Sequence, residues 1–426
     1  MGTSKIKETA DKMKIVIASL ITLFFCISMT VPSESLKGFD KILNLLLLIC
    51  IIYGVIATII EYRKINVIVL LITMFFFIIR IISYNQNHLT VTYGGAFMLQ
   101  LFFLVGINKH LLAGKKVILA VFGSFLIFDV LAIAFCYFRF YFKYEEVAII
   151  VEKYAAKGME PQTSLFQNPN YAGIMAGTAI VICCTLIMNG SIKRKMSYGL
   201  ILVMLLNFIF LFANTGCRSA QTGVLVTLLG LLLVRFNKKL DSVKVLLGIG
   251  LISCFLLLLP LYSLVNWEEN SLYLDNVSQT EKTIDALSSG RYAIWKTTIL
   301  SMKGHELFGF GNSTTAWDKR KELVENTNTD FKSKEYIESA NHKRQHNGYL
   351  AVYNEAGLVG VISLLLLLLS RIKNLKGRFC DGQWEKMLLI YIFWINLFEA
   401  KFILHLFFTG LLMMILFLPP EEAVPE

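Results

Sequence analysis

Long apolar runs dominate this sequence and constrain its fold more than any other feature. A helix needs roughly 20 apolar residues to cross the hydrocarbon core of a bilayer, which is about 30 Å thick. Of the 426 residues, 56% are hydrophobic and only 17% are charged, a balance unlike that of a water-soluble domain. We therefore expect an all-α polytopic membrane protein with about twelve transmembrane helices. The predicted spans lie near residues 15–31, 42–60, 65–82, 94–107, 117–138, 171–189, 197–213, 220–234, 245–265, 346–369, 386–400 and 402–418.

Basic residues are distributed unevenly among the connections between these runs. Cytoplasmic loops of membrane proteins carry an excess of Lys and Arg. With a cytoplasmic N-terminus, the predicted cytoplasmic segments hold 21 Lys and Arg, whereas the short outer connections hold 8. The formal net charge of +11 is therefore a topology signal and not a nucleic-acid-binding surface. We expect the N-terminus in the cytoplasm and no nucleic-acid partner.

One connection is much longer than the others and divides the chain. The predicted outer loop between the ninth and tenth spans, residues 266–345, contains 11 Lys and Arg and 12 Asp and Glu, so it is nearly neutral. We expect spans one to nine in residues 1–265, an extracytoplasmic loop domain in 266–345, and the last three spans with a cytoplasmic tail in 346–426.

Several polar residues lie inside the predicted spans. An ionisable residue at membrane depth costs about 2.5–3.5 kcal/mol on insertion scales, so such residues usually face a bundle interior or a wet cavity. Here they are Arg80, Asp129, Glu355 and Glu399, with Asn207 as a neutral companion. All except Glu355 are expected in the outer half of the membrane, which indicates a hydrated cavity open to the outside where Arg80 and Asp129 bind substrate. The alternative is that Arg80 reaches the membrane surface while Asp129 and Glu399 form interhelical pairs.

Three motifs are expected at the outer face, and their residue types suit chemistry on a phosphate-bearing lipid. Guanidinium groups stay charged and bind phosphate oxygens in a planar fork, so Arg218 and Arg291 are candidates to hold a pyrophosphate. His346 is a candidate to take a proton from an attacking sugar hydroxyl. The motifs are Asn214-Thr215-Gly216-Cys217-Arg218-Ser219-Ala220; Ser289-Gly290-Arg291 with Trp295 and then Phe308-Gly309-Phe310-Gly311-Asn312; and His346-Asn347-Gly348-Tyr349-Leu350.

Each of these residues also has a plain structural interpretation. A histidine at a helix end is commonly an interface residue, and Arg291 with Trp295 four residues later can be a packed cation–π pair. If residues 346–369 form one continuous helix, Tyr353, Gly357 and Gly360 share the face of His346. The glycines then form a groove on that face, and Glu355 lies on the opposite side.

The three motifs in this order, with a large outer loop between the ninth and tenth of twelve spans, resemble the O-antigen ligase and polymerase family of bacterial surface-polysaccharide enzymes. The resemblance runs from about Asn168 to Leu369. It rests on the Thr-Gly-Cys-Arg-Ser turn, Ser-Gly-Arg with a following Trp, Phe-Gly-Phe-Gly-Asn, and His346-Asn347 with Leu350, Gly357 and Gly360. The family usually has Ser where this chain has Cys217.

The resemblance implies a glycosyltransferase-C-like, metal-independent, inverting enzyme of the bacterial cytoplasmic membrane that needs no cofactor. It would act in the bilayer on donor and acceptor glycans linked to undecaprenyl pyrophosphate, with flippase and chain-length regulator proteins as partners. Arg218, Arg291 and His346 would be catalytic. Asn347, Tyr353 and Trp295 would bind substrate, together with Arg80 and Asp129. No DxD-type carboxylate pair occurs in the outer loops, which agrees with metal independence.

Two activities of this kind remain open. A polymerase extends a lipid-linked capsule or O-antigen chain, and a ligase transfers the finished chain to another acceptor. A composition rich in Lys, Ile and Asn is typical of low-GC bacteria, many of which lack lipid A, and this favours the polymerase. A flippase or exporter of lipid-linked sugars is the rival from another class. It predicts polar residues in both membrane halves and internal symmetry, and the sequence shows neither.

Overall fold

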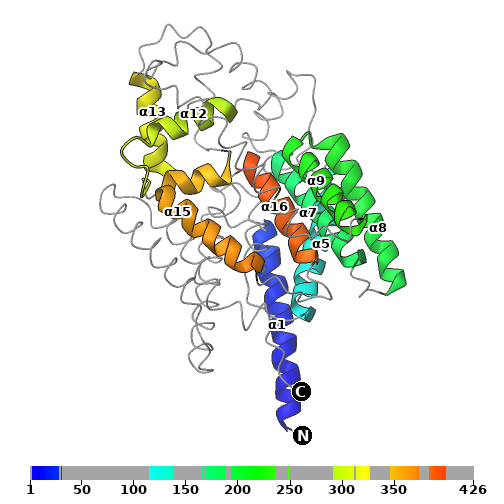
Figure 1. Cartoon of the computed structure of the whole chain (residues 1–426). Coiled ribbons are helices and arrows are strands. Elements are labelled where there is room, and N and C mark those ends of the chain that lie inside the picture. Colours follow the sequence, from blue (N-terminus) through cyan, green and yellow to red (C-terminus); the bar gives the residue numbers. More distant parts are fainter. Residues whose placement is uncertain are drawn as a thin grey trace.

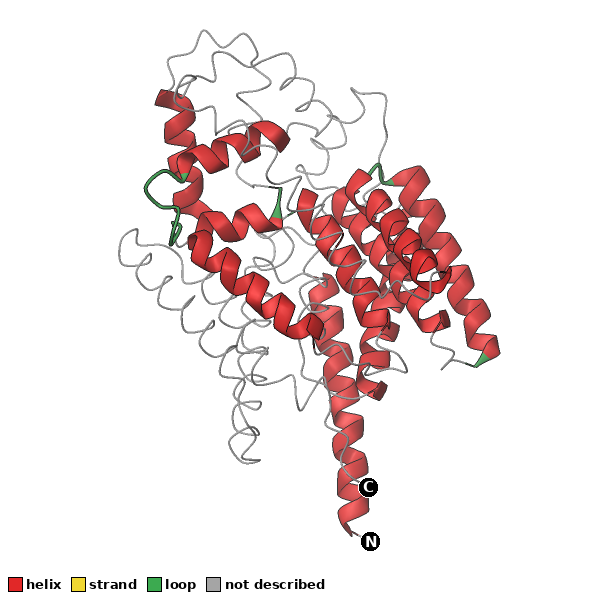
Figure 2. Cartoon of the chain, in the orientation of Figure 1, coloured by secondary structure: helices red, strands yellow, loops and turns green. Residues whose placement is uncertain are grey.

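The computed structural model describes residues 2–27, 30, 115–137, 165–166, 169–188, 193–236, 248, 291–310, 313–326, 346–373 and 383–399. Within these residues the regular structure is helical throughout (Figure 2). The helices are α1 (Gly2–Ile27), α5 (Lys115–Tyr137), α7 (Pro169–Met188), α8 (Arg194–Ile209) with a π-helical end η2 (Phe210–Asn214), α9 (Arg218–Phe236), α12 (Arg291–Ser301), α13 (Ser313–Asn326), α15 (Gly348–Lys373) and α16 (Gln383–Phe398).

The described helices agree with the predicted all-α membrane architecture. Three stretches are long and apolar enough to cross a bilayer, namely Lys116–Phe135, Pro169–Met188 and Arg194–Asn214, and Arg218–Leu233 and Lys386–Phe398 are shorter apolar helices. Seven of the twelve predicted spans fall on described helices. The other five, near 42–60, 65–82, 94–107, 245–265 and 402–418, lie outside the described residues, apart from the single residue 248.

The helices form two groups that meet between α15 and α16 (Figure 1). The larger group is a bundle of α1, α5, α7, α8, α9 and α16, in which α7 packs against α5, α8, α9 and α16. In the smaller group α12, α13 and α15 pack against one another. The candidate catalytic residues come from both groups, so their junction positions the site.

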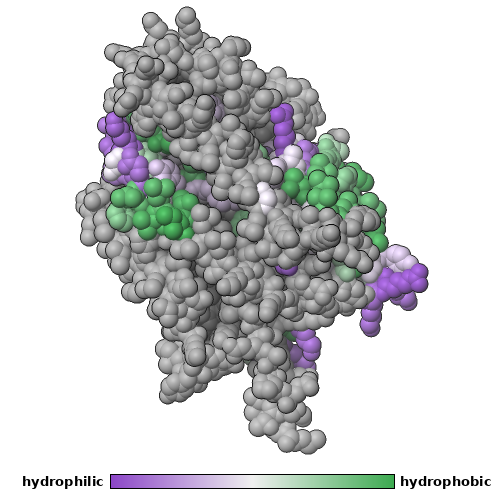
Figure 3. Space-filling model, viewed as in Figure 1, coloured by the Kyte–Doolittle hydropathy of each residue, from purple (hydrophilic) through white to green (hydrophobic). Residues whose placement is uncertain are grey.

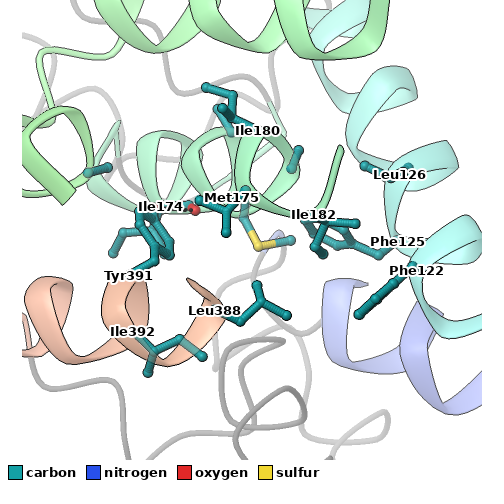
Figure 4. Packing of buried hydrophobic residues seen from close by; sticks show 14 of the residues in the cluster. Phe122, Phe125, Leu126, Ile174, Met175, Ile180, Ile182, Leu388, Tyr391 and Ile392 are labelled. Atoms are coloured by element: carbon teal, nitrogen blue, oxygen red, sulfur yellow. Dashed lines mark hydrogen bonds between the residues drawn. The ribbon is translucent and has the colours of Figure 1, made fainter. Parts of the chain in front are cut away.

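Close packing around Tyr391 holds α16 in the bundle (Figure 4). The buried Tyr391 hydroxyl donates a hydrogen bond to the carbonyl of Ile174 in α7 at 3.0 Å. A Cβ at Gly177 would overlap this hydroxyl, and a Cβ at Gly223 in α9 would lie 3.1 Å from the same ring. The glycines therefore let α7 and α9 approach α16, which brings the last turn of α16 beside the start of α7.

The outer surface of α8 and α9 is apolar, as the green area on the right of Figure 3 shows. Leu202 and Leu229 are 70% and 57% exposed, and neighbouring side chains on both helices are similarly open. An exposed patch of this kind on a soluble protein would be an aggregation liability. On a membrane-spanning bundle it is the surface that faces lipid.

Candidate functional site

Glu399 follows the last turn of α16 and lies at the centre of the candidate site. Its Oε1 accepts hydrogen bonds from Arg291 Nη2 at 2.8 Å and from Asn170 Nδ2 at 3.1 Å. Its Oε2 lies 3.4 Å from Nδ1 of His346. The Glu399 side chain is only 5% exposed, whereas Arg291 and His346 are 17% and 21% exposed. A buried carboxylate thus joins two predicted catalytic side chains that remain open to solvent.

The ends of four helices converge on this carboxylate. Arg291 is the first residue of α12, Asn170 is the second of α7, and His346 immediately precedes the cap of α15. Helix N-termini carry a partial positive charge that favours anions. Glu399 is therefore contacted by side chains from the starts of three helices, where the partial positive charge of the helix favours an anion.

His346 has an unusual backbone conformation. Its φ of 49° lies in the left-handed region, and it is the one non-glycine residue with positive φ in the described part of the chain. Such a conformation is costly for a residue with a Cβ and occurs most often at functional sites. It turns the chain so that residue 346 faces Glu399 while residue 347 caps the N-terminus of α15.

Asn347 performs a structural task at this point. Its Oδ1 accepts hydrogen bonds from the backbone N–H of Tyr349 and Leu350 at 2.9 and 3.0 Å, which is a helix N-cap. Its Nδ2 donates to the carbonyl of Leu397 at 3.0 Å. The buried side chain therefore joins the start of α15 to the end of α16 and sets the separation of His346 and Glu399.

The turn at residues 215–217 places Arg218 at the start of α9. Gly216 has a φ of 61°, and the Thr215 hydroxyl donates to the carbonyl of Leu211 and accepts from the N–H of Cys217. A Cβ at Gly173 in α7 would overlap Cys217, so this glycine lets the turn lie directly against α7. These contacts build the turn that the Thr-Gly-Cys-Arg-Ser motif predicts.

Cys217 connects this turn to the Glu399 cluster. Its thiol contacts the carbonyl of Asn170 at 3.6 Å, and it lies within electrostatic range of Glu399 and Arg291. Burial raises the pKa of the Cys217 thiol above its ordinary value, which favours the neutral thiol over the thiolate. The neighbouring Arg218 side chain is exposed and makes no hydrogen bond or ion pair within the described residues.

Trp295 and Tyr353 lie beside the cluster on its apolar side. Trp295 is buried with Ile294, Ile299 and Leu350, and both Tyr353 and Phe398 pack against this group. Phe398 precedes Glu399 directly. These contacts place one buried and one half-buried aromatic ring next to the polar site.

Asp129 is not brought to the Glu399 cluster. The buried Asp129 carboxyl lies within electrostatic range of Asn207 and Cys183. Cys183 is thirteen residues along α7 from Asn170, a distance of about 20 Å at 1.5 Å per residue. Arg80, the other candidate predicted to line the cavity, lies outside the described residues.

The continuous helix expected from residue 346 onward is wrong in two respects. α15 begins at Gly348, after His346, and it is interrupted at Gly357, where φ is 63° and ψ is −162°. A helical wheel therefore does not relate His346 to Gly357 or Gly360. The expected close approach at Gly357 does occur, but the partner is the backbone of residues 307–308.

Sequence reasoning did not assign Glu399 and Asn170 to the site, although signals for both were present. Glu399 was singled out as an acid in an apolar run, which is a functional indicator. Asn170 belongs to the Asn168-Pro169-Asn170 sequence that opens α7. Neither observation reveals partners that are 53 to 229 positions away along the chain.

Comparison with known proteins agrees with this geometry. Residues 202–365 match the family described as O-antigen ligase. This part of the chain is similar to that family. The matched range begins in α8, includes Arg218, Arg291 and His346, and ends in α15. The resemblance predicted from the motifs is confirmed.

A relative in Haemophilus influenzae extends the similarity without naming a function. It is 26% identical over 217 residues and is described as an uncharacterized protein. The match covers 50% of this chain and 51% of the relative, so the chain spans about half the length of the curated relative it matches.

Proposed function

We propose that the protein is a polysaccharide polymerase of the bacterial cytoplasmic membrane. It would transfer a growing glycan from undecaprenyl pyrophosphate to a hydroxyl of a lipid-linked repeat unit at the outer face of the membrane. The observation that carries this proposal is the Glu399 carboxylate joining Arg291 and His346. This cluster would combine a general base, His346, with the carboxylate that orients it, Glu399, and a cation that binds anions, Arg291.

His346 would act as the general base. If Nδ1 carries a proton and donates it toward Glu399, Nε2 is the nitrogen with the lone pair and accepts the proton of the acceptor hydroxyl. The Glu399 charge then stabilises the imidazolium that forms. The His346 side chain is 21% exposed, so an acceptor hydroxyl can approach it from solvent.

Arg291 and Arg218 would bind the leaving group. Arg291 uses Nη2 for Glu399 and has further guanidinium N–H groups for phosphate oxygens. Arg218 is the first residue of α9, and its side chain makes no competing ion pair within the described residues. Two guanidinium groups and several helix N-termini would neutralise a pyrophosphate without a metal ion.

The proposed reaction is a single displacement. The acceptor oxygen forms a bond to the anomeric carbon of the donor glycan, and the bond from that carbon to the pyrophosphate oxygen breaks. The electron pair leaves with the lipid pyrophosphate, and the hydroxyl proton passes to His346. Attack from the face opposite the leaving group inverts the anomeric configuration.

The remaining candidates have supporting roles in this proposal. Trp295 and Tyr353 would contact sugar rings next to the reacting centre. Asn347 would position His346 through its cap and its bond to α16, and would not touch substrate. Asp129 and Arg80 remain proposed substrate contacts, and Asp129 would have to act away from the Glu399 cluster.

A ligase is the second candidate, and the family description favours it. The same site serves either activity, since only the acceptor differs. Lipid-linked glycans extracted from a strain that lacks the protein distinguish the two. A polymerase predicts accumulated single repeats, and a ligase predicts long chains that remain on lipid. Accumulation on the cytoplasmic face would contradict both and indicate a flippase. This result can be interpreted without knowing whether a flippase or a chain-length regulator acts together with the protein.

A further inference from the structure

A segment of the predicted outer domain packs against the interruption of α15 and forms hydrogen bonds with its backbone. Residues 348–356 and 358–373 form its two helical halves, separated by Gly357. The N–H of Leu358 donates to the carbonyl of Glu306 at 2.8 Å, and that of Val359 donates to Leu307 at 3.2 Å. In return, the N–H of Phe310 donates to the carbonyl of Asn354 at 2.9 Å.

These three hydrogen bonds satisfy backbone groups that a broken helix would otherwise leave without partners. Two glycines make them possible. A Cβ at Gly357 would overlap the backbone of residues 307–308, and a Cβ at Gly309 would approach the backbone of Glu355 and Ala356. A helix interrupted at a glycine is tolerated in a membrane where a neighbouring segment pairs the freed backbone groups in this way. The interruption at Gly357 is therefore compatible with a position at the outer edge of the hydrocarbon core.

The side chains at this junction are apolar and open. Leu307 and Phe308 are each 58% exposed, and Leu358 and Ile362, one turn apart on α15, are 45% and 53% exposed. We call these four side chains the elbow patch. It appears as the green area over the bend of α15 on the left of Figure 3. Lys303, His305 and Glu306, which precede it, are exposed and polar.

The length of the second half of α15 sets the depth of the elbow patch. Residues 358–373 contain 16 residues, which rise about 24 Å at 1.5 Å per residue. The hydrocarbon core is about 30 Å thick. With Arg371 and Lys373 at the cytoplasmic boundary, as the distribution of basic residues predicts, the elbow lies within the outer edge of the core. Any tilt of the helix places it deeper.

We propose that the elbow patch inserts into the outer leaflet and contacts phospholipid acyl chains. Residues 307 and 308 then belong to the membrane-embedded surface, although the sequence places them in an aqueous loop. Their partner is hydrocarbon, and the polar residues 303–306 mark the level of the lipid headgroups. The segment anchors α12 and the broken helix to the bilayer surface, on the side where a lipid-linked substrate must arrive.

Photo-crosslinking in phosphatidylglycerol vesicles tests this contact. Benzoylphenylalanine replaces Phe308 in the full-length protein, and intact mass spectrometry measures the adducts formed on illumination. The same residue at Phe208, which is exposed on α8, is the lipid-facing control, and at Glu322, which is exposed on α13, it is the aqueous control. We expect a mass gain of one phospholipid at positions 308 and 208 and none at 322.

A second crosslinker position controls for the possibility that the substitution at residue 308 disturbs the local structure. Benzoylphenylalanine at Leu307 should give the same phospholipid adduct, because that side chain is equally exposed. Adducts at position 208 but none at either 307 or 308 would overturn the proposal. So would crosslinks from both elbow positions exclusively to other parts of the protein or to a second copy of the chain.

Discussion

Replacing Glu399 with Gln tests the central contact of the site with almost no change in shape. The amide oxygen retains the bonds to Arg291 and Asn170, but an amide nitrogen then faces Nδ1 of His346 in place of Oε2. This nitrogen donates, so Nδ1 must accept and the proton moves to Nε2. The lone pair needed for general-base catalysis is then on the wrong side of the ring.

The expected loss follows from the contacts. A hydrogen bond to a charged group contributes about 1.5–3 kcal/mol, and the His346 contact at 3.4 Å falls at the lower end. Weakening both charged contacts of Glu399 costs about 3 kcal/mol, or about 10²-fold in rate at 1.36 kcal/mol per tenfold change. The estimated rate loss is a lower bound, because the change of His346 tautomer removes general-base catalysis in addition.

The assay is chain elongation by the purified protein in vesicles, with lipid-linked repeats as substrate. Glu322→Gln is the matched control, because Glu322 is exposed and its pair with Lys319 lies at the surface. We expect the control to elongate at the rate of the unmodified protein. A Glu399→Gln variant that elongates within threefold of that rate would refute the assignment of Glu399 to His346.

Three further predictions concern residues around the site. Gly173→Ala should displace the turn that bears Cys217 and slow elongation, whereas Gly199→Ala, where an added Cβ meets nothing within 4 Å, should not; equal rates would contradict the packing argument. Asn347→Ala should lower the thermal unfolding midpoint, since loss of an N-cap costs about 0.5–2 kcal/mol; an unchanged midpoint would count against its structural role. Asp129→Asn should keep more elongation activity than Glu399→Gln, because Asp129 lies about 20 Å along the bundle; equal loss in both would show that Asp129 acts in the same site.

The spans were predictable because the signal is local. An apolar run bounded by polar residues indicates a membrane helix wherever it lies, and the runs at 117–138 and 171–189 correspond to α5 (Lys115–Tyr137) and α7 (Pro169–Met188) within a few residues. Lipid requires the backbone to pair within each segment, so helix follows directly from apolar length.

The interruption at Gly357 was not predictable from periodicity. A glycine permits positive φ but does not require it. The conformation at this position depends on hydrogen bonds from Leu358 and Val359 to residues 306 and 307. Those partners lie about 50 positions earlier, and no local pattern connects the two segments.

The site was predictable in its residue types and not in its connections. Arg291 and His346 were identified from their chemistry and spacing, and the structure brings both to one carboxylate. Glu399 was visible as an acid in an apolar run, but its partners are 108 and 53 positions away. Tertiary packing of α12, α15 and α16 creates the site, and a single sequence does not encode that packing in a readable form.

The most direct test of the proposed function uses the purified protein in vesicles with one substrate, an undecaprenyl pyrophosphate-linked repeat, in the presence of a metal chelator. The proposal predicts longer lipid-linked glycans with inverted anomeric linkages and release of free undecaprenyl pyrophosphate. It also predicts that the His346→Ala and Arg291→Ala variants remain folded in the membrane but do not elongate the lipid-linked glycan. Elongation by the His346→Ala variant at the unmodified rate, or no elongation by the unmodified protein, would contradict it.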